Sequence, residues 1–302
     1  MSEKISRVAV IDIGTHSVLY LLAEKGKDGI VRALHQELRS PRLGKGFGKT
    51  KRISHKAILK TLPILNEYLT LSQKQNAHRV IAVATHALRV AENQWEVVKI
   101  FREATGLEVH ILTEEEEARA SYSGAMYGRE ISGPVCMIDI GGGSTEMVLG
   151  VNGQIDSLKS IPVGAVTLTE HWNGETEHKV LEIFKLHFNA MPVSSFARVL
   201  VGVGGTITTL AGLELGLATY DPNQVDGFWI EFSKIKNWYE RLSSLPPEQR
   251  KALVALDPDR ADILPAGLLI LKTICTLGNF KKVLVSDRGL RFGIALQQFE
   301  VN

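Results

Sequence analysis

The sequence predicts an α/β protein, because short runs rich in β-branched residues alternate with stretches of helical spacing. A second observation is an internal repeat, in which a strand ending in an aspartate and a glycine turn occurs twice. At about 150 residues per domain, a chain of 302 residues has room for two such halves. The predicted strands lie at residues 8–13, 78–83, 107–112, 135–140 and 146–151, and the predicted helices at 95–105, 113–127, 167–190 and 262–277.

The repeat rests on two matches in the same order along the chain. The segment beginning at Asp12 (Asp-Ile-Gly-Thr) matches the segment at Asp139 (Asp-Ile-Gly-Gly), an offset of 127 residues (139 − 12). The run from Arg79 matches the run from Arg198 at an offset of 119 (198 − 79). Similar offsets indicate a duplication, with chance similarity of buried strands as the alternative.

Composition excludes several classes of protein. With 44% hydrophobic and 23% charged residues the chain is not globally disordered, and it has no run of about 18 apolar residues that would span a membrane. Two cysteines are too few for a disulfide framework or a four-cysteine zinc site. A net charge of +2 gives no case for nucleic-acid binding. The charged N-terminus leaves no room for a signal-peptide core, so we expect a cytoplasmic protein.

The segment 139–146 carries the most chemistry. Asp139 and Glu146 flank it, and carboxylates are the groups that hold a divalent cation such as Mg²⁺. Between them lie three glycine amides that can converge on an anion and two hydroxyl donors: Gly141, Gly142, Gly143, Ser144 and Thr145. A phosphate with its magnesium ion fits this set, and a glycine-rich hairpin turn is the simpler alternative.

Two further glycine turns follow predicted strands. The first contains Gly14, Thr15, His16 and Ser17, and the other contains Gly204, Gly205 and Thr206. Three such turns in a duplicated chain predict loops that meet in one interdomain cleft. Neither a Walker NTPase nor a Rossmann dehydrogenase is supported, since Leu43 and Ile207 occupy positions where those motifs need glycine.

The helix predicted from Thr113 begins with four glutamates. Thr113 and Glu116 have the spacing of a capping box, which accounts for acidic residues at a helix start without any function. Glu117 lies one turn into the helix, on a face with small residues. A carboxylate there suits a base that orients or deprotonates a water molecule.

Six segments carry recognisable motifs: residues 12–17, 84–89, 116–119, 139–146, 202–206 and 286–291. Together they resemble the exopolyphosphatase and guanosine pentaphosphate phosphohydrolase (Ppx/GppA) family. They occur in the family's order over nearly the whole chain, and the acidic helix followed by the triple-glycine loop separates this family from related kinases.

The resemblance implies a fold and a domain division. It implies two duplicated ribonuclease-H-like domains, as in the actin, sugar-kinase and Hsp70 superfamily, with the active site in the interdomain cleft. Domain I is expected at residues 1–127, with a C-terminal helix at about 290–302 packing back on it, and domain II at residues 128–289. The chain is similar to the short, two-domain members, for which we expect a preference for short polyphosphates or a nucleotide.

The resemblance also implies an activity and roles for individual residues. The activity is Mg²⁺-dependent hydrolysis of a terminal phosphoanhydride, from inorganic polyphosphate or from the 5′ end of pppGpp, a nucleotide of the stringent response. By motif position Glu117 is the general base, Asp139 and Glu146 serve metal and water, and Arg89 neutralises charge on the phosphate chain. The terminal phosphate that is removed would lie on the backbone of Gly141, Gly142 and Gly143, with Ser144.

One residue departs from the family pattern, and one charged stretch has two interpretations. His16 stands where the family usually has asparagine, so it either donates to a phosphate when protonated or simply packs. Residues 39–52 hold six cationic side chains among glycines. They form either a solvated, mobile surface loop or an electrostatic lid over a polyanion.

Two other functions remain open from sequence. One is a phosphotransferase of the same superfamily, which would need an adenosine site near Gly204. The other is a non-catalytic sensor that binds polyphosphate or guanosine tetra- or pentaphosphate. The resemblance is also compatible with a homodimer.

Overall fold

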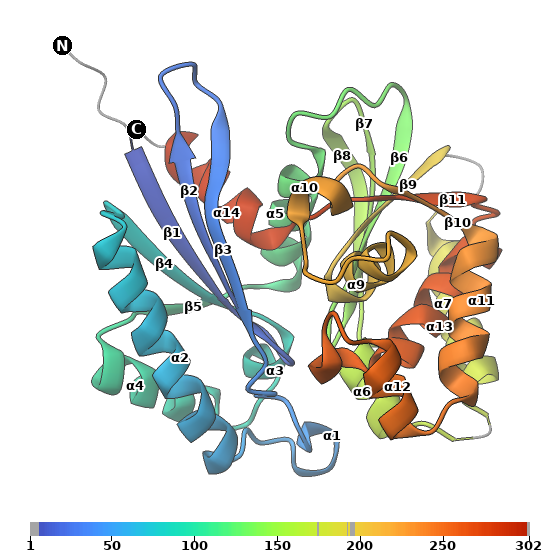
Figure 1. Ribbon diagram of the computed structural model, residues 1–302, viewed down its shortest axis with the longest axis horizontal. Helices are drawn as coiled ribbons and strands as arrows, with labels where there is room; N and C mark the ends of the chain where they lie inside the picture. The colour runs from blue at the N-terminus through green and yellow to red at the C-terminus, as the bar shows by residue number, and fades with distance from the viewer. Residues whose placement is uncertain (1–5, 174, 192, 194–196, 301–302) are drawn as a thin grey trace. The chain divides into compact units, whose positions relative to one another are not determined.

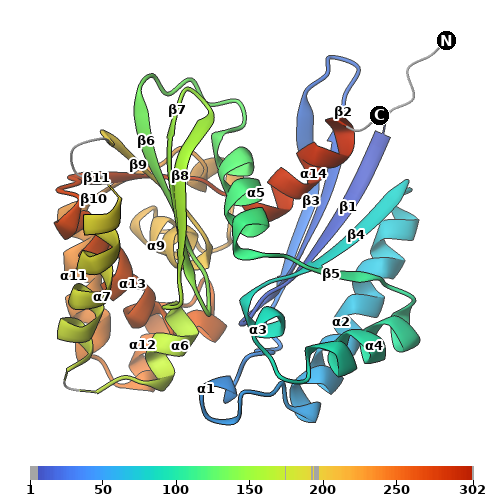
Figure 2. The ribbon, with the colours of Figure 1, turned by 180° about the vertical axis from the view of Figure 1, so that it is seen from behind.

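The computed structural model describes residues 6–173, 175–191, 193 and 197–300. It divides into two compact units (Figures 1 and 2): unit 1 takes in residues 1–124 and 290–302, and unit 2 takes in residues 125–289. The sequence analysis puts its boundary at residues 127 and 128. In the structure the change falls at Gly124 and Ala125, inside helix α5 (Glu114–Met126).

Unit 1 is built on a five-stranded mixed sheet in the order β3-β2-β1-β4-β5. The strand β1 forms an antiparallel hairpin with β2 on one side and pairs in parallel with β4 on the other. Its central strands are apolar because both faces of the sheet are covered. The strands are β1 (Ser6–Ile13), β2 (Val18–Lys25), β3 (Val31–Arg39), β4 (Arg79–Ala84) and β5 (Val109–Ile111).

Helices cover both faces of this sheet. The long helices α2 and α4 pack on one face, where Ile11, Leu65 and Phe101 are fully buried in one core, and α14 packs against β1 and β2 on the other (Figure 1). Gly106, in the left-handed conformation, ends α4 after residue 105, where the predicted helix also ends. The helices of unit 1 besides α5 are α1 (Phe47–Thr50), α2 (His55–Lys74), α3 (His86–Arg89), α4 (Gln94–Thr105) and α14 (Leu290–Glu300). Residues 301 and 302 of the predicted C-terminal helix lie outside the described residues.

Unit 2 repeats the plan with a six-stranded sheet in the order β10-β11-β9-β6-β7-β8. Here β6 forms the hairpin with β7 and pairs in parallel with β9, as β1 does with β2 and β4. The repeated segments at Asp12 and Asp139 lie on β1 and β6, so the predicted duplication is confirmed. The strands are β6 (Pro134–Ile140), β7 (Thr145–Val151), β8 (Gln154–Ile161), β9 (Val199–Val203), β10 (Trp229–Glu231) and β11 (Lys282–Val285).

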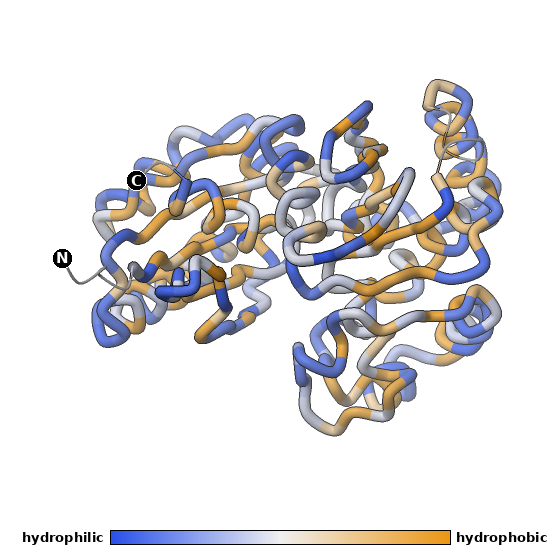
Figure 3. The backbone as a smooth tube through the Cα atoms, turned by 90° about the horizontal axis from the view of Figure 1, so that it is seen from above, coloured by the Kyte–Doolittle hydropathy of each residue, from blue (hydrophilic) through white to orange (hydrophobic). Residues whose placement is uncertain are grey.

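The core of unit 2 forms around helix α13, which packs on α7, α9, α11 and β6. Figure 3 shows hydrophobic stretches of the chain running through the interior and hydrophilic stretches at many of the outer turns. The predicted helix at 167–190 is two helices, α6 and α7, and residue 174 between them lies outside the described residues. The helices are α6 (Ala165–Glu170), α7 (Thr176–Ala190), α9 (Gly205–Glu214), α10 (Pro222–Val225), α11 (Phe232–Ser244), α12 (Pro247–Leu253), the 3₁₀ turn η1 (Pro258–Arg260) and α13 (Leu264–Leu277).

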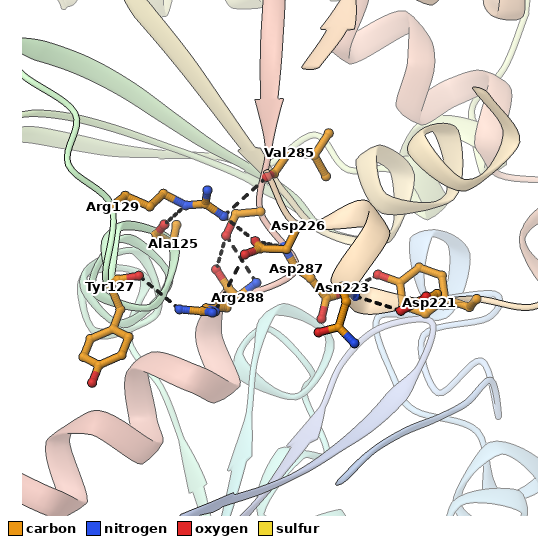
Figure 4. A network of polar contacts seen from close by, with 11 residues as sticks. Ala125, Tyr127, Arg129, Asp221, Asn223, Asp226, Val285, Asp287 and Arg288 are labelled. Atoms are coloured by element: carbon orange, nitrogen blue, oxygen red, sulfur yellow. Dashed lines mark hydrogen bonds and ion pairs between the residues drawn. The ribbon is translucent and has the colours of Figure 1, made fainter. Parts of the chain in front are cut away.

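A polar network ties together the two segments through which the chain enters and leaves unit 2 (Figure 4). The carboxylate of Asp226 accepts from the Arg129 guanidinium and from the amide of Asp287, and it lies 3.8 Å from Arg288 Nε. Arg288 Nη1 also donates to the carbonyl of Tyr127 at 3.2 Å. The arginine and aspartate of the Ser286–Arg291 segment therefore hold the exit of unit 2 to its entry.

No helix in the described part of the chain combines the length and the apolar character needed to cross a lipid bilayer.

Candidate functional site

The glycine turns after β1 and β6 have the same hydrogen bond. The amide of Gly14 donates to the carbonyl of Ser17 at 2.9 Å, and the amide of Gly141 donates to the carbonyl of Ser144 at 3.0 Å. Each bond closes the hairpin that leads into the next strand. The two turns that the sequence predicts to be related are therefore the same structural element, here named loop 1 (residues 14–17) and loop 2 (residues 141–144).

A second segment supports loop 2 from behind. The carbonyls of Gly141 and Gly142 accept from the amides of Ala165 and Val166, at 2.9 and 2.8 Å, where α6 begins. In a trans peptide unit the N–H points opposite to the C=O, so the N–H groups of residues 142 and 143 point away from α6. Among the described residues none accepts a hydrogen bond from the amides of residues 142–144. Consecutive free amides of this kind form an anion-binding concavity.

Loop 1 is supported in the same way by residues that follow β3. The carbonyl of Thr15 accepts from the amide of Gly44 at 2.8 Å, and the carbonyl of His16 accepts from the amide of Arg42 at 2.9 Å. The peptide units of loop 1 are thus turned like those of loop 2, with their N–H groups away from the supporting segment. His16 and Ser17 are buried in unit 1, at 5% and 6% exposure.

Two carboxylates of unit 2 face each other across the β6–β7 hairpin. Asp139 and Glu146 are direct partners in the antiparallel register, so their side chains share a face with Cβ atoms about 5 Å apart. Glu146 is 1% exposed, and its Oε1 accepts from Ser160 Oγ at 2.9 Å. A carboxylate that is buried so fully is paired or coordinates a metal.

This pair fits Mg²⁺, which usually takes one or two protein carboxylates and fills its other positions with water and phosphate oxygens. Within the described residues there is no group of three or more His, Cys, Asp or Glu side chains placed to hold a metal. The two carboxylates are therefore the candidate ligands that the structure offers. In unit 1 the position opposite Asp12 is Leu19, so the corresponding pair is missing there.

The third predicted turn, at the start of α9, lies beside this pair. A Cβ atom on Gly204, whose φ is +92°, would come within 2.9 Å of Asp139 Oδ1, so the Asp139 carboxylate rests against this turn. The guanidinium of Arg260 lies over the neighbouring Gly205, where a Cβ atom would be 2.2 Å from it. Arg260 is 7% exposed and bonded to Asp257 at 3.0 Å.

Arg260 is the residue that the sequence reasoning missed. It stands alone among aspartates and prolines in a stretch without a motif, and only the fold brings it to the glycine turn. Two predicted donors, by contrast, are used inside unit 2. The Thr145 hydroxyl donates to the carbonyl of Val163 at 2.7 Å, and the Thr206 side chain packs against Gly267 of α13.

In unit 1, Arg89 holds Glu117. Arg89 Nη1 lies 2.7 Å from Glu117 Oε2 and donates also to the carbonyl of Leu112 at 3.0 Å. Both side chains are largely buried, with exposures of 14% and 10%. Arg89 Nε and Nη2 are buried and have no hydrogen-bond partner among the described residues. A positively charged group with two free donors is thus positioned next to the carboxylate.

At the start of α5, Glu116 has a structural role, whereas Glu117 is a candidate catalytic residue. Glu116 accepts from the amide of Thr113 at 2.8 Å, and its own amide donates to Thr113 Oγ1 at 3.2 Å. The predicted capping box is therefore confirmed, which accounts for Glu116. Glu117 has no such role at the helix start, and its carboxylate turns inward to Arg89.

Burial changes the protonation of two other side chains, Cys136 and His86. Burial raises the pKa of the Cys136 thiol to about 12, so this cysteine remains protonated and does not act as a nucleophile. His86, three residues before Arg89, has its pKa lowered to about 4 by burial and by the positive charge of Arg89. Its imidazole is therefore neutral at pH 7.

Comparisons with known proteins agree on one family. Residues 22–301 match the model of the Ppx/GppA phosphatase family. The chain is 31% identical to exopolyphosphatase 2 of Mycobacterium tuberculosis, over 97% of this chain and 98% of that protein. It is 27% identical to a bifunctional 3-dehydroquinate synthase/phosphatase of Fusobacterium nucleatum, over 97% of this chain and 46% of that protein.

Solved structures agree with this result. The crystal structure of the Aquifex aeolicus member of the Ppx/GppA protein family superposes with a TM-score of 0.82 at 33% identity, covering 99% of both chains. A structure described as an exopolyphosphatase-like protein gives a TM-score of 0.90 at 25% identity, covering 98% of both chains. Both likenesses extend over the two units of this chain.

Proposed function

The chain belongs to the Ppx/GppA phosphatase family, and from this premise we propose that it hydrolyses the terminal phosphoanhydride of a phosphate chain, with inorganic polyphosphate as substrate. The relative from Mycobacterium tuberculosis is named for this activity. The observation that carries the proposal is the Glu117 carboxylate, largely buried and held at 2.7 Å by Arg89. Hydrolysis needs a base for water, whereas a pure sensor needs none. A phosphotransferase would use a base as well, but it would also need a site for a second substrate.

Glu117 acts as the general base. Its ion pair with Arg89 favours the ionised carboxylate, and the capped start of α5 adds the favourable field of a helix N-terminus. The carboxylate accepts a proton from water as the water oxygen bonds to the terminal phosphorus. The bridging P–O bond breaks, and orthophosphate and a chain shorter by one phosphate leave.

Arg89 has a second task in the proposed reaction. One of its nitrogens holds Glu117, and Nε and Nη2 are free to donate to phosphate oxygens. Phosphoryl transfer depends mainly on positioning and on neutralising charge at the equatorial oxygens. A single arginine that contacts both the base and the phosphate couples the position of the water to that of its target.

Unit 2 supplies the phosphate cradle. The outward amides of residues 142–144 bind phosphate oxygens, and the guanidinium of Arg260 over Gly205 adds positive charge beside the third turn. Asp139 and Glu146 would hold Mg²⁺, which, when bound, neutralises charge on the phosphate oxygens. We propose the same groups for pppGpp, whose 5′ end carries the same phosphoanhydride.

Phosphate release measured with Mg²⁺ tests this function on tripolyphosphate, long polyphosphate and pppGpp in parallel. Glu117→Gln keeps the shape of the side chain and removes the base, so kcat should fall by about 10²–10⁴-fold. Glu114→Gln is the matched control, because it removes an exposed carboxylate from the same helical turn and should leave kcat unchanged. Equal rates for wild type and Glu117→Gln would contradict the proposed base. No release from any substrate would contradict the hydrolase.

A further inference from the structure

Residues 42–52, here named the cationic strap, are built into unit 1 at both ends. At the start, the amides of Arg42 and Gly44 donate to the carbonyls of loop 1. At the end, the carbonyl of Lys51 accepts from the amide of Glu92 at 3.0 Å. Immediately after it, Ile53 exchanges two hydrogen bonds with the side chain of Asn93, at 2.9 and 3.0 Å. The sequence left open whether this stretch is a mobile surface loop or an electrostatic lid, and in the structure it is an element anchored at both ends that carries helix α1 (Figure 2).

The strap also has a buried side. Leu43 is fully buried and Phe47 is 7% exposed, both in the core beneath α2. Because apolar side chains fix the inner face, the polar side chains of the strap are displayed outward in a defined order. A solvated loop with no preferred position would not bury these two residues.

The outward face is strongly cationic. Residues 38–66 contain eight Lys and Arg side chains and no Asp or Glu. Lys45 is exposed and makes no ion pair with any described residue, and the Lys51 ammonium lies 5.8 Å from the centre of the Phe47 ring. Arg52 pairs with Glu96 at 3.3 Å, with both side chains more than half exposed. The side chain of Lys49 lies outside the described residues.

Unit 2 shows that these charges are not needed to support a loop. The segment at the start of α6 donates to loop 2 through the amides of Ala165 and Val166, and it does so with apolar side chains. The strap performs the same backbone task in unit 1 while carrying lysines and arginines. The positive charge is therefore an addition to the structural role.

We infer that the cationic strap binds the internal phosphates of a polyphosphate chain that lies on loop 1, and thus favours chains that reach the strap over tripolyphosphate, without favouring chains of hundreds of phosphates. This inference rests on the proposed function. A linear polyanion gains favourable contacts for each phosphate that reaches a cation, and those contacts are screened by salt. Because the strap is one short segment, the gain ends once the chain covers it.

Steady-state kinetics on a series of chain lengths tests the strap. In the double variant Lys45→Ala/Lys51→Ala, KM for chains well above tripolyphosphate should rise by about five- to tenfold, from two screened ion contacts. The value of kcat should stay within about twofold, since neither residue belongs to the proposed chemistry. The rise should shrink at high salt, and KM for tripolyphosphate, which is too short to reach the strap, should not change.

The matched control is Lys27→Ala/Lys74→Ala, which removes the same charge from exposed positions in the turn after β2 and at the end of α2. Its KM should equal that of wild type. Equal KM in the strap and control variants would overturn the inference, and so would an equal rise for tripolyphosphate, since the strap would then only support loop 1. If no variant releases phosphate, the proposed function fails, and the strap is judged by calorimetric binding of long polyphosphate with EDTA present. There a fivefold weaker Kd for the strap variant supports the inference, and an unchanged Kd overturns it.

Discussion

Loops 1 and 2 have the same backbone and different chemistry. Both close a hairpin with the same hydrogen bond, and both are supported from behind by amides that follow the third strand of the sheet. Across the hairpin, however, Asp139 of unit 2 faces Glu146, whereas Asp12 of unit 1 faces Leu19. The duplicated fold thus fixes where the outward-turned amides lie, and single side chains decide which copy has a candidate pair of metal ligands.

The third turn differs in the same manner. By the offset of 119 residues, Thr85 and His86 of unit 1 correspond to Gly204 and Gly205 of unit 2. Gly205 accommodates the Arg260 guanidinium, and His86 leads into the helix that carries Arg89. Unit 1 therefore supplies the candidate base and its arginine, and unit 2 supplies the candidate metal ligands.

Among the variants that test this comparison of the two units, the largest effect is expected from giving unit 2 the residue of unit 1. Glu146→Leu removes one of the two candidate magnesium ligands, and kcat should fall by about 10²–10³-fold, as when one group that stabilises transition-state charge is removed. The thermal midpoint should hold or rise, because an apolar side chain replaces a buried carboxylate. Activity titrated against Mg²⁺, together with thermal unfolding, checks both parts. Wild-type activity with an unchanged Mg²⁺ requirement would show that the two loops do not differ in metal binding.

A smaller effect should separate the two supporting segments. A Cβ atom on Gly164 would lie 2.5–2.6 Å from backbone atoms of loop 2, whereas one on Gly44 would lie 2.4 Å from a methyl group of Thr15. Backbone cannot move aside, so Gly164→Ala should lower kcat by about 100-fold and the free energy of unfolding by about 1–3 kcal/mol. Gly44→Ala should lower both quantities by less, because the methyl group of Thr15 can move.

A second substitution should restore the activity of Gly44→Ala. Thr15→Ser removes the methyl group that the new Cβ would meet, so Gly44→Ala/Thr15→Ser should recover most of the activity lost in Gly44→Ala. Phosphate release and urea unfolding of the three variants give the comparison. An undiminished loss in the double variant would mean that the methyl contact is not what limits Gly44.

The smallest effect concerns pH and unit 1 alone. His86 has a folded pKa of about 4 against an ordinary value of 6.5, so the unfolded chain binds the proton first as pH falls. The contribution of the neutral His86 to the free energy of unfolding is therefore complete above pH 6.5 and is lost as the pH falls from 6.5 to 4. From pH 7 to 5 the free energy of unfolding should fall by about 2 kcal/mol for this reason. His86→Gln should flatten this part of the stability curve, measured by urea unfolding at the two pH values. If the free energy of unfolding falls equally with pH in wild type and His86→Gln, His86 is not the source of this pH dependence.

Local sequence determined much of the fold. The strands β1, β6 and β7 were predictable because each is a short apolar run that is almost wholly buried, and β4 because its second half is. The edge strand β5 was predicted from the apolar residues around it, although His110 within it is exposed. The capping box at Thr113 was predictable because its hydrogen bonds join residues three apart. The edge strand β3 was not, since it is largely exposed and lacks an apolar pattern.

What the sequence by itself determined was the repeat, the strands that end in an aspartate and a glycine turn, and the candidate residues on them, because these depend on neighbouring residues and on burial periodicity. Tertiary structure alone decided which groups meet. It paired Arg89 with Glu117, set Asp139 opposite Glu146, laid Arg260 over Gly205 and anchored the cationic strap to loop 1. Each of these contacts joins segments that no local pattern relates, and they form only when the strands take their order in the sheet.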